Sequence, residues 1–545
     1  MPFTRRTFLR QAAVASLPVS AAAMLPVRHA AAAAGSLENE PVPLTLLHTN
    51  DLHGHVWHPD EPRGLVRLAS FVKQVRSEMP NVLLLDAGDI IHGTPEEKAF
   101  GGLAILDTMN ALRYDVATVG NHEFDFGQTV FRNALAHARF PMLSANVVEE
   151  KTGNPFGGLK PWTVLTSGGV RVGVFGLTTP TTVQIEWPRT LEGIVFADPF
   201  AAAQKAITEL RTDAKVDCVI ALSHLGFEDD KKLAATVTGM DLIIGGHSHT
   251  MLDEPVWVNG VLIAQTGAHG RALGRIDLMV RKAQGTEPGS IFSVNGKDGK
   301  WWGSDGVLAP TNLPYPEKPL LKPVEGTESD PTALAAYLPW SNKLRPTLEE
   351  TLTTAAEPLP ALRVSTQETA LGNLFADAIR VRMKTEIALM SSGQIALVGL
   401  PAGKVTTGDL YRVLGSYTRQ HLVVARIPGA AIERVLTTVR SGENIARYPV
   451  HLSGVTVGSD GTVRVGAEPI AADRVYTIAS AAHVIQDYFY AKPDVEIVSD
   501  AVDAPTVRDA AIAHLRGHAA LTNELPSPPR WLPVAVLDEV PPPLR

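Results

Sequence analysis

The sequence predicts an α/β domain followed along the chain by a second, α+β domain. Its 545 residues exceed what one hydrophobic core usually organises. In the first half, short runs rich in Val, Ile and Leu alternate with helix-like segments, as in a parallel sheet covered on both faces. Near residue 283 the chain becomes rich in Gly, Pro and Asn, and a helical pattern returns later. These observations place a domain boundary in the middle of the chain.

The composition is that of a globular protein, with 45% hydrophobic and 19% charged residues. The formal net charge is −8 at pH 7, and no run of Lys or Arg builds a basic face, which argues against nucleic acid as a partner. A small anion held by metals is compatible with this charge. Cys218 is the only cysteine, so the chain forms no internal disulfide, and its setting in "VDCVIAL" predicts a buried thiol.

Residues 1–34 have the features of an export signal. Arg5 and Arg6 stand in "TRRTFLR", an Ala-rich and weakly apolar stretch follows, and the segment ends in small residues suited to signal peptidase. This resembles a twin-arginine signal, which implies the twin-arginine translocase as export partner and a periplasmic or secreted protein. Pro18 and Pro26 interrupt the apolar stretch, which is also short for a membrane span. We therefore expect no stable membrane insertion once the signal is removed.

Beyond the signal, short apolar runs predict buried strands. They read "LTLLHT", "NVLLLDAGD", "DVATVGNHE", "FPMLSAN", "VRVGVFGLTT", "VDCVIALSH", "DLIIGGHSH" and "VLIAQTGAH". Between the first two lies "GLVRLASFVKQVRSEMP", whose apolar residues recur at helical spacing until Pro80. These helix positions are Leu65, Leu68, Val72, Val75 and Met79. The pattern is that of a β-α-β unit.

Five of the predicted strands end in Asp, Asn or His. The residues are Asp51 and His53 after the first, Asp89 after the second, Asn121 and His122 after the third, His224, and then His247 with His249. Open α/β sheets bind their ligands at the carboxyl ends of the strands. A mixed set of oxygen and imidazole ligands suits a borderline divalent metal such as Mn, Zn, Fe or Co. The sequence therefore predicts a metal site at this edge.

The other histidines of this region receive a simpler interpretation. Eleven of the 17 histidines lie between positions 48 and 269, and a single one is more often a core or loop residue than a ligand. We assign that ordinary role to His58, His137 and His269. His55 and His58 are interpreted as residues of the loop that surrounds the metal ligands.

The motifs "NDLHG", "DAGD", "GNHEFDFG", "LSHLG" and "GGHSH" occur in this order. Together they resemble the calcineurin-like metallophosphoesterases, in the branch that includes bacterial 5'-nucleotidases and UDP-sugar hydrolases. The resemblance implies a four-layer β-sandwich flanked by helices, and we assign it to residues 42–282.

The resemblance also implies roles for individual residues. Asp51, His53 and His249 would hold one metal, Asn121, His224 and His247 the other, and Asp89 would bridge the two. Such a pair lowers the pKa of a bridging water, and the resulting hydroxide attacks phosphorus. His122 would stabilise the transition state while Asp125 orients its ring. The implied cofactors are two divalent ions, either Mn, Zn, Co or Fe.

Residues 283–354 are interpreted as an insertion and interdomain linker, and residues 355–535 as the second domain. The stretch "STQETALGNLFADAIRVRM" resembles the opening helix of the C-terminal 5'-nucleotidase domain, and Ser365 with Glu368 has the form of a capping box. The sequence departs from that family further on. "MSSGQIALVG" lacks the substrate-binding Arg of relatives, and "GSYTRQ" replaces an aromatic that stacks on the base.

A substrate pocket in the second domain would have to use other side chains. The candidates are Tyr417, Arg419, Tyr488 and Tyr490, which are equally compatible with core or surface positions. The expected activity is hydrolysis of nucleotides or related small phosphate esters after export. Two alternatives stay open: a thiosulfohydrolase of sulfur oxidation on the same scaffold, and a non-catalytic envelope protein that binds a metal or ligand. Retention of all ligands together with His122 and Asp125 argues against the latter.

Overall fold

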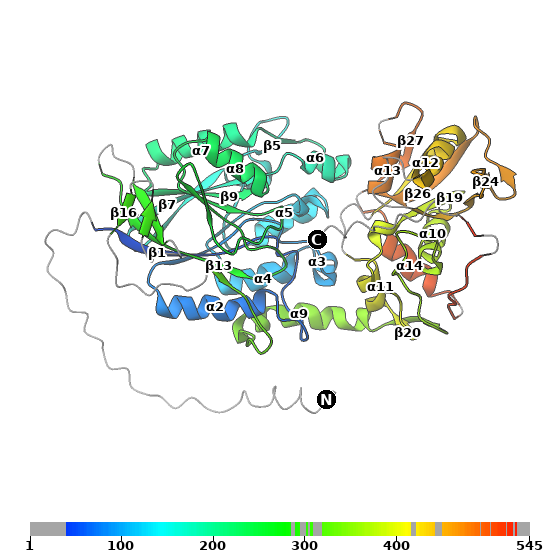
Figure 1. Cartoon of the computed structure of the whole chain (residues 1–545), viewed down its shortest axis with the longest axis horizontal. Helices are drawn as coiled ribbons and strands as arrows, with labels where there is room; N and C mark the ends of the chain where they lie inside the picture. Colours follow the sequence, from blue (N-terminus) through cyan, green and yellow to red (C-terminus); the bar gives the residue numbers. More distant parts are fainter. Residues whose placement is uncertain are drawn as a thin grey trace. The chain divides into compact units, whose positions relative to one another are not determined.

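The computed structural model describes residues 40–284, 289–294, 301–303, 306–308, 319–415, 421–441, 450–490, 492–501, 503–518, 520–526 and 529–530 (Figure 1). The export signal predicted for residues 1–34 lies outside this part of the chain, as do Tyr417 and Arg419. Among the described residues, no helix is both long and apolar enough to cross a bilayer.

The first sheet of the described chain joins parallel strands from the start of the first domain to a later antiparallel strand. Its parallel strands are β1 (Val42–Thr49), β2 (Val82–Asp86), β3 (Val116–Thr118) and β4 (Met142–Leu143), which are neighbours in this order. On its other edge β1 pairs with the antiparallel β13 (Leu273–Arg281), so that Leu46 lies opposite Ile276. The short strands β5 (Val147–Glu149) and β8 (Ile194–Phe196) form a separate pair.

The second sheet is also mainly parallel in its centre. In order across the sheet, its strands are β11 (Val256–Val258), β12 (Val261–Ala264), β10 (Leu242–Gly245), β9 (Cys218–His224), β7 (Val170–Thr178) and β6 (Trp162–Ser167). Strands β12, β10, β9 and β7 run parallel, while the two edge strands are antiparallel to their neighbours. Cys218 begins β9 and is buried, as predicted.

The two sheets pack face to face, and helices cover their outer faces. Leu44 and Leu46 of β1 join Val172, Val174 and Ile220 in the core between the sheets, while the alternate residue Leu47 joins the helix-facing core. The helices α2 (Leu65–Glu78), α4 (Leu103–Leu112) and α5 (Gln128–His137) lie on the first sheet, and α7 (Pro199–Thr212) and α8 (Phe227–Thr236) on the second (Figure 1). The predicted four-layer fold is confirmed.

The predicted amphipathic helix is α2. It begins at Leu65 after Gly64, whose φ of 101° suits glycine, and ends before Met79. All five apolar residues that define its periodicity are buried in one cluster with α4. The helical spacing in the sequence therefore identified the core-facing side.

Most of the predicted insertion and linker, up to residue 348, contributes strands and a helix next to the first domain. Strands β14 (Ser290–Val294), β15 (Trp301–Gly303) and β16 (Gly306–Leu308) extend the first sheet beyond β13, and β17 (Leu320–Leu321) also pairs with β13. Helix α9 (Pro331–Leu348) packs on α4, where the Trp340 indole donates a hydrogen bond to Asp107. The predicted insertion thus carries a hairpin, as its Gly-rich composition indicates.

The second domain is built on a mixed sheet with helices on both faces. The sheet order is β22 (Val450–Ser453), β19 (Ile387–Ser391), β26 (Val475–Ala481), β21 (Leu422–Pro428) and β27 (Glu496–Ser499). Helices α10 (Ala370–Met383), α11 (Thr407–Val413) and α14 (Val507–Leu515) share one core with it, and α12 (Gly429–Ser441) and α13 (Ala482–Tyr488) share the other. Smaller elements are the pair β18 (Thr351–Ala355) with β20 (Gly403–Thr406), and the meander β23 (Val455–Val457), β24 (Val463–Val465) and β25 (Glu468–Pro469).

The capping box predicted at Ser365 and Glu368 is wrong. Helix α10 begins later, and Thr369 is its N-cap, accepting a hydrogen bond from the Gly372 amide at 3.1 Å. The Glu368 carboxylate instead accepts a hydrogen bond from the side chain of Asn373. Several polar residues precede this helix, and the sequence pattern alone does not decide which one caps it.

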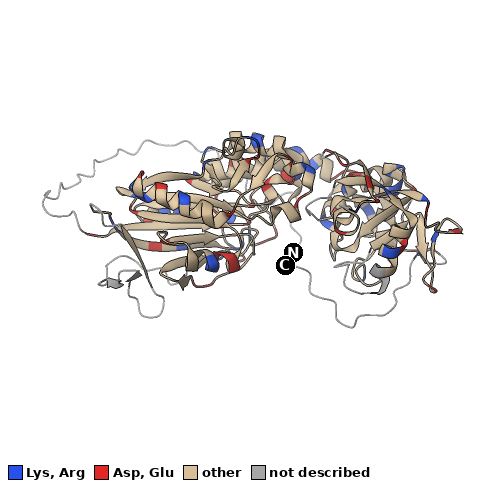
Figure 2. Cartoon of the chain, turned by 90° about the horizontal axis from the view of Figure 1, so that it is seen from above, with Lys and Arg blue, Asp and Glu red and all other residues tan. Residues whose placement is uncertain are grey.

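Charged side chains are mixed in sign along the helices. Figure 2 shows Lys and Arg next to Asp and Glu over both domains. On α8, for example, Lys231 and Lys232 pair with Glu228 and Asp229 in the preceding turn. Exposed pairs of this kind contribute little to the stability of a helix, because solvent screens them.

Candidate metal centre

The structure brings the seven predicted metal ligands together where strands of both sheets end. Asp51 and His53 follow β1, Asp89 follows β2, Asn121 follows β3, His224 ends β9, and His247 and His249 follow β10. Five of them, Asp51, His53, Asp89, Asn121 and His224, are at most 5% exposed. Burying several polar groups in one place is costly unless they are paired or coordinate a metal.

Most of these residues have an unusual backbone conformation. Asp51, His53, Asp89, His247 and His249 have φ between 47° and 72°, the left-handed region that non-glycine residues rarely adopt. In each case the left-handed turn follows a strand. Such conformations are retained where the surrounding structure holds them, and they cluster at functional sites.

One group of ligands contains Asp89, His224 and His247, whose ligand atoms lie within 4.8 Å of one another. The Nδ1 of His224 is 2.7 Å from the Ala87 carbonyl and donates to it, which leaves Nε2 for the metal side, 3.0 Å from Asp89 Oδ2. The buried Oδ1 of Asn121 has no hydrogen-bond partner in the described part of the chain. These atoms fit a divalent cation.

The other group contains Asp51, His53 and His249. The Nε2 atoms of His53 and His249 are 3.0 Å apart, and His249 Nε2 is 3.3 Å from Asp51 Oδ1. His53 Nε2 is also 3.8 Å from Asp89 Oδ2. Asp89 therefore lies next to both groups, as a bridging carboxylate must.

Protonation of the ligands responds to the same contacts. Burial acts to lower the pKa of His224, but Asp89 outweighs it and raises that pKa to about 10. Burial lowers the pKa of His53 well below its usual range, while Asp89 opposes the effect. A cation and a proton compete for the same imidazole nitrogen, so metal binding at His224 requires loss of this proton.

Beside the ligands, His122 and Asp125 form the predicted pair. They belong to the short helical turn η1 (His122–Phe124) and its end, and His122 Nδ1 is 2.8 Å from Asp125 Oδ2. The other ring nitrogen, Nε2, lies 3.8 Å from Asp89 Oδ2. Burial acts to lower the pKa of His122, but Asp125 and Asp89 outweigh it and hold the pKa well above its usual value. One ring nitrogen of His122 thus faces Asp125 and the other faces the ligands.

Two family models match the chain in this order. Residues 44–251 match the calcineurin-like phosphoesterases, and residues 351–489 match the 5'-nucleotidase C-terminal domain. The chain belongs to the calcineurin-like phosphoesterases that carry this C-terminal domain.

Individual relatives agree with this family. A trifunctional nucleotide phosphoesterase, YfkN of Bacillus subtilis, is 32% identical over 73% of this chain, although the match spans only 28% of the YfkN length. Protein UshA of Yersinia enterocolitica is 28% identical over 80% of this chain and 84% of its own. The crystal structure of a 5'-nucleotidase precursor from Thermus thermophilus is 26% identical, has a TM-score of 0.64, and covers 90% of this chain and 99% of its own. These similarities support a nucleotidase or phosphoesterase function.

Sequence reasoning missed His92 in this phosphoesterase site. The ring of His92 stacks on that of His122, with centroids 4.5 Å apart and planes 23° from parallel. Its Nδ1 also forms an ion pair with Asp125 Oδ2, so that Asp125 lies between two imidazoles. Burial acts to raise the pKa of Asp125, but His92 and His122 hold it below its usual value. No local signal pointed to His92, because only the fold brings it to Asp125.

Glu123 is a second residue that sequence reasoning missed. It is fully buried, and its carboxylate accepts hydrogen bonds from the amides of Gly120 and Ile90 at 2.6 Å and of Asp89 at 3.2 Å. The loops that carry Asp89 and Asn121 are therefore fastened to each other through one side chain.

The ordinary role that we assigned to three histidines holds for two of them. His58 is exposed, and His137 pairs with Asp107 at 2.7 Å. His269 is different, and our interpretation of it changes, because its ring nitrogen lies within 4.8 Å of those of His53 and His249. His55 lies in the adjoining loop, with its ring 4.4 Å from that of His269.

The candidate pocket residues of the second domain have different environments. Tyr488 is 6% exposed and belongs to the hydrophobic core on the α12 and α13 side of the sheet. Tyr490 is 38% exposed. Tyr417 and Arg419 lie outside the described residues. A nucleobase pocket formed by these four side chains stays a prediction.

Glu123→Gln is expected to loosen the metal centre. The amide keeps one acceptor oxygen but presents an NH₂ group to backbone donors, which leaves buried amides unpaired at ~1–3 kcal/mol. We expect a lower melting temperature and weaker metal retention during dialysis, measured by calorimetry and elemental analysis. The matched control is Glu150→Gln at an exposed position. Equal behaviour of the two variants would contradict the fastening role.

Proposed function

We propose that this protein is an exported metal-dependent phosphoesterase that hydrolyses nucleotides or related phosphate esters. The observation that carries the proposal is the position of Asp89, with one carboxylate oxygen 3.0 Å from His224 Nε2 and 3.8 Å from His53 Nε2. Two ligand groups that share a carboxylate are the arrangement for two neighbouring cations. The family and its relatives support the same chemistry.

The cations would be divalent Mn, Zn, Co or Fe, because the donors are imidazoles, carboxylates and one amide oxygen. Asp51, His53, Asp89 and His249 would hold one, and Asp89, Asn121, His224 and His247 the other. When bound, such a pair supplies a water of lowered pKa and positive charge for the phosphoryl oxygens.

The protein's own acid would be His122. Asp125 accepts from its Nδ1, which fixes the ring and leaves Nε2 to donate to a phosphoryl or leaving oxygen. The ring is 19% exposed, so a substrate can reach it, whereas Asp125 behind it is 4% exposed. Asp125 and His92 would act indirectly, by orienting the His122 ring. The two histidines lie between Asp125 and the substrate, so Asp125 itself does not contact the substrate.

A nucleotide is the favoured substrate because the chain carries the C-terminal 5'-nucleotidase domain. In addition, YfkN is a nucleotide phosphoesterase and the Thermus thermophilus protein is a 5'-nucleotidase precursor. We propose that the second domain contributes the base contacts, with Tyr417, Arg419, Tyr488 and Tyr490 as candidates. Base stacking on an aromatic ring is worth ~1–3 kcal/mol in nucleic-acid complexes, so one ring changes the affinity measurably. The thiosulfohydrolase alternative uses the same metals and differs in the bond that is cleaved.

Residues 1–34 support export by the twin-arginine translocase, with the mature protein in the periplasm or outside the cell. That route carries folded proteins, which suits a metal site assembled before export. Fusion of these residues to a reporter, in cells with and without the translocase, tests the route. Equal export in both strains would overturn it.

The proposed function is tested by product release from a substrate panel. Purified protein with measured metal content is given AMP, ATP, UDP-glucose, 2',3'-cyclic AMP, bis(p-nitrophenyl) phosphate and a thiosulfonate. We expect a clear preference for one nucleotide over the aryl diester. Cleavage of the thiosulfonate alone would replace the proposal by the alternative, and hydrolysis of none with both metals bound would favour a binding protein.

Asp89→Asn is expected to lower turnover by at least about a thousandfold, comparable with loss of a major catalytic group, and to reduce metal content. The change removes a charged ligand from both cations at once. Asp213→Asn is the matched control, because Asp213 is exposed at the end of α7. Full metal content and activity in Asp89→Asn would refute the bridging assignment.

Asp125→Asn is expected to shift the pH profile. The raised pKa of His122 means that the imidazolium is present below that pKa and is lost as pH rises through it. Without the Asp125 charge this pKa falls, so the alkaline limb of kcat should move to lower pH while metal content stays unchanged. An unmoved alkaline limb would show that another group, or the metal-activated water, sets it.

A further inference from the structure

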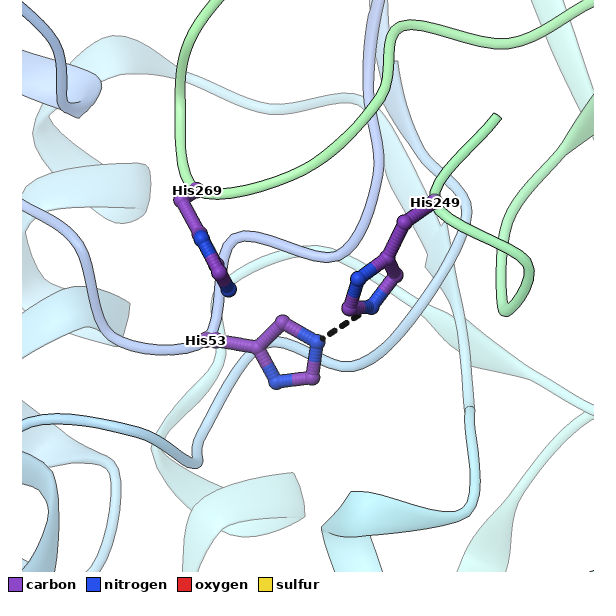
Figure 3. A group of neighbouring side chains, drawn as sticks. All are labelled: His53, His249 and His269. Atoms are coloured by element: carbon purple, nitrogen blue, oxygen red, sulfur yellow. Dashed lines mark hydrogen bonds between the residues drawn. The ribbon is translucent and has the colours of Figure 1, made fainter. Parts of the chain in front are cut away.

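A third imidazole lies at the first ligand group and has no task in the proposed function. Figure 3 shows the side chains of His53, His249 and His269 converging on one space, with His269 coming from a separate loop. The ligand atoms of the three residues lie within 4.8 Å of one another. The ring centroid of His269 is 5.3 Å from that of His53 and 5.6 Å from that of His249.

The ring of His269 is steeply inclined to the other two rings. The plane of His269 is 67° from that of His53 and 70° from that of His249. Three imidazoles inclined to one another can each direct a nitrogen to a shared point. The ring nitrogens of His269 have no hydrogen-bond partner in the described part of the chain, and the residue is half-buried.

The loop that carries His269 is fixed to the loop of the predicted ligands. The His269 amide donates to the Asp51 carbonyl at 2.8 Å, and the Gly270 carbonyl accepts from the Gly64 amide at 2.9 Å. The Asn50 side chain donates to the Gly267 carbonyl at 2.6 Å and accepts from the Thr266 amide and hydroxyl. The position of His269 is thus set in advance of any ligand.

His269 also shares the backbone conformation of the ligands. Its φ is 62°, within the range of the five left-handed ligand residues. For a residue that carries a Cβ this conformation is unfavourable by ~1–2 kcal/mol, and it is retained where the surrounding structure holds it. In this loop it directs the ring toward His53 and His249.

We propose that His269 is an additional ligand of the cation held by Asp51, His53 and His249. The inference rests on the proposed function in one respect only, namely that cations bind at these residues. The first position would then offer three imidazoles, His53, His249 and His269, whereas the second offers His224 and His247. Nitrogen-rich sites favour Zn, Co, Ni or Fe over Mn and Mg. The two positions would therefore differ in affinity and in preferred metal.

His269→Phe tests the proposal, because it keeps a ring of similar shape and removes both nitrogens. Wild type, His269→Phe and the control His137→Phe are loaded with Zn²⁺, and zinc release is followed against a graded chelator. We expect one of two zinc ions to bind about tenfold or more weakly in His269→Phe only, since even outer-shell changes cost 10–100-fold. Equal release curves for all three proteins would overturn the proposal.

X-ray absorption at the zinc edge supplies a readout that does not depend on activity. The spectrum of His269→Phe should contain one imidazole fewer per protein than that of wild type. In His269→Cys a thiolate would replace the imidazole, and a sulfur shell at ~2.3 Å should appear. Absence of that shell in a folded, zinc-loaded His269→Cys protein would contradict ligation by this position.

Failure of the proposed function gives a different result. Wild-type protein that binds no zinc would refute the metal centre itself, whichever residue stands at 269. Two tightly bound zinc ions with no dependence on His269 would refute only the additional ligand. Thermal unfolding of the metal-free proteins separates a folding defect in a variant from loss of a ligand, because a ligand effect disappears without metal.

Discussion

The placement of Asp89 is the constraint on which the rest of the molecule depends. A carboxylate that is 1% exposed loses its hydration, at a cost of several kcal/mol unless positive charge lies close to it. The protein supplies the imidazoles of His53, His122 and His224 within 3.8 Å of one oxygen. These rings can carry protons or leave their nitrogens to cations. The positive charge beside the Asp89 carboxylate can therefore come from protons on these rings or from bound metals. Metal binding releases the protons.

The sandwich fold explains how such a group can be assembled. Parallel strands β1, β2 and β3 of one sheet and β9 and β10 of the other end at the same place, because the sheets pack through a shared core. The first sheet provides four of the seven ligands and the second provides three, and each ligand group draws on both sheets. The side chains packed between the sheets therefore set how closely the ligands within each group approach one another. The left-handed residues then direct the polar groups across the ends of the strands. Glu123 fastens the loop after β2 to the loop after β3.

The sequence predicted those parts of the site that follow strands in local motifs. Asp51, His53, Asp89 and Asn121 are found by reading along single segments, since the strand and its ligand are neighbours in the chain. His92, Glu123 and His269 were missed because their roles depend on contacts between segments, as between His269 and His53. The N-cap of α10 was misplaced for a different reason, namely that Ser365 and Thr369 both have suitable side chains and only the backbone selects one. The four layers could be predicted because the family resemblance specifies them, whereas apolar runs alone predict only buried strands.

The difference between the two domains limits how far the metal centre identifies the substrate. The centre interacts with a phosphoryl group and its leaving oxygen, and these atoms are the same in many esters. A fold can host many functions, and the groups that distinguish substrates lie away from the reacting atoms. In this chain Tyr488 is buried in the core and Tyr490 is exposed, so the two tyrosines cannot contribute equally to a base pocket. The type of reaction thus follows from ligand residues that must converge on one point. The choice of substrate follows from side chains that need not converge in this way. Sequence patterns therefore predict the positions of those side chains far less well.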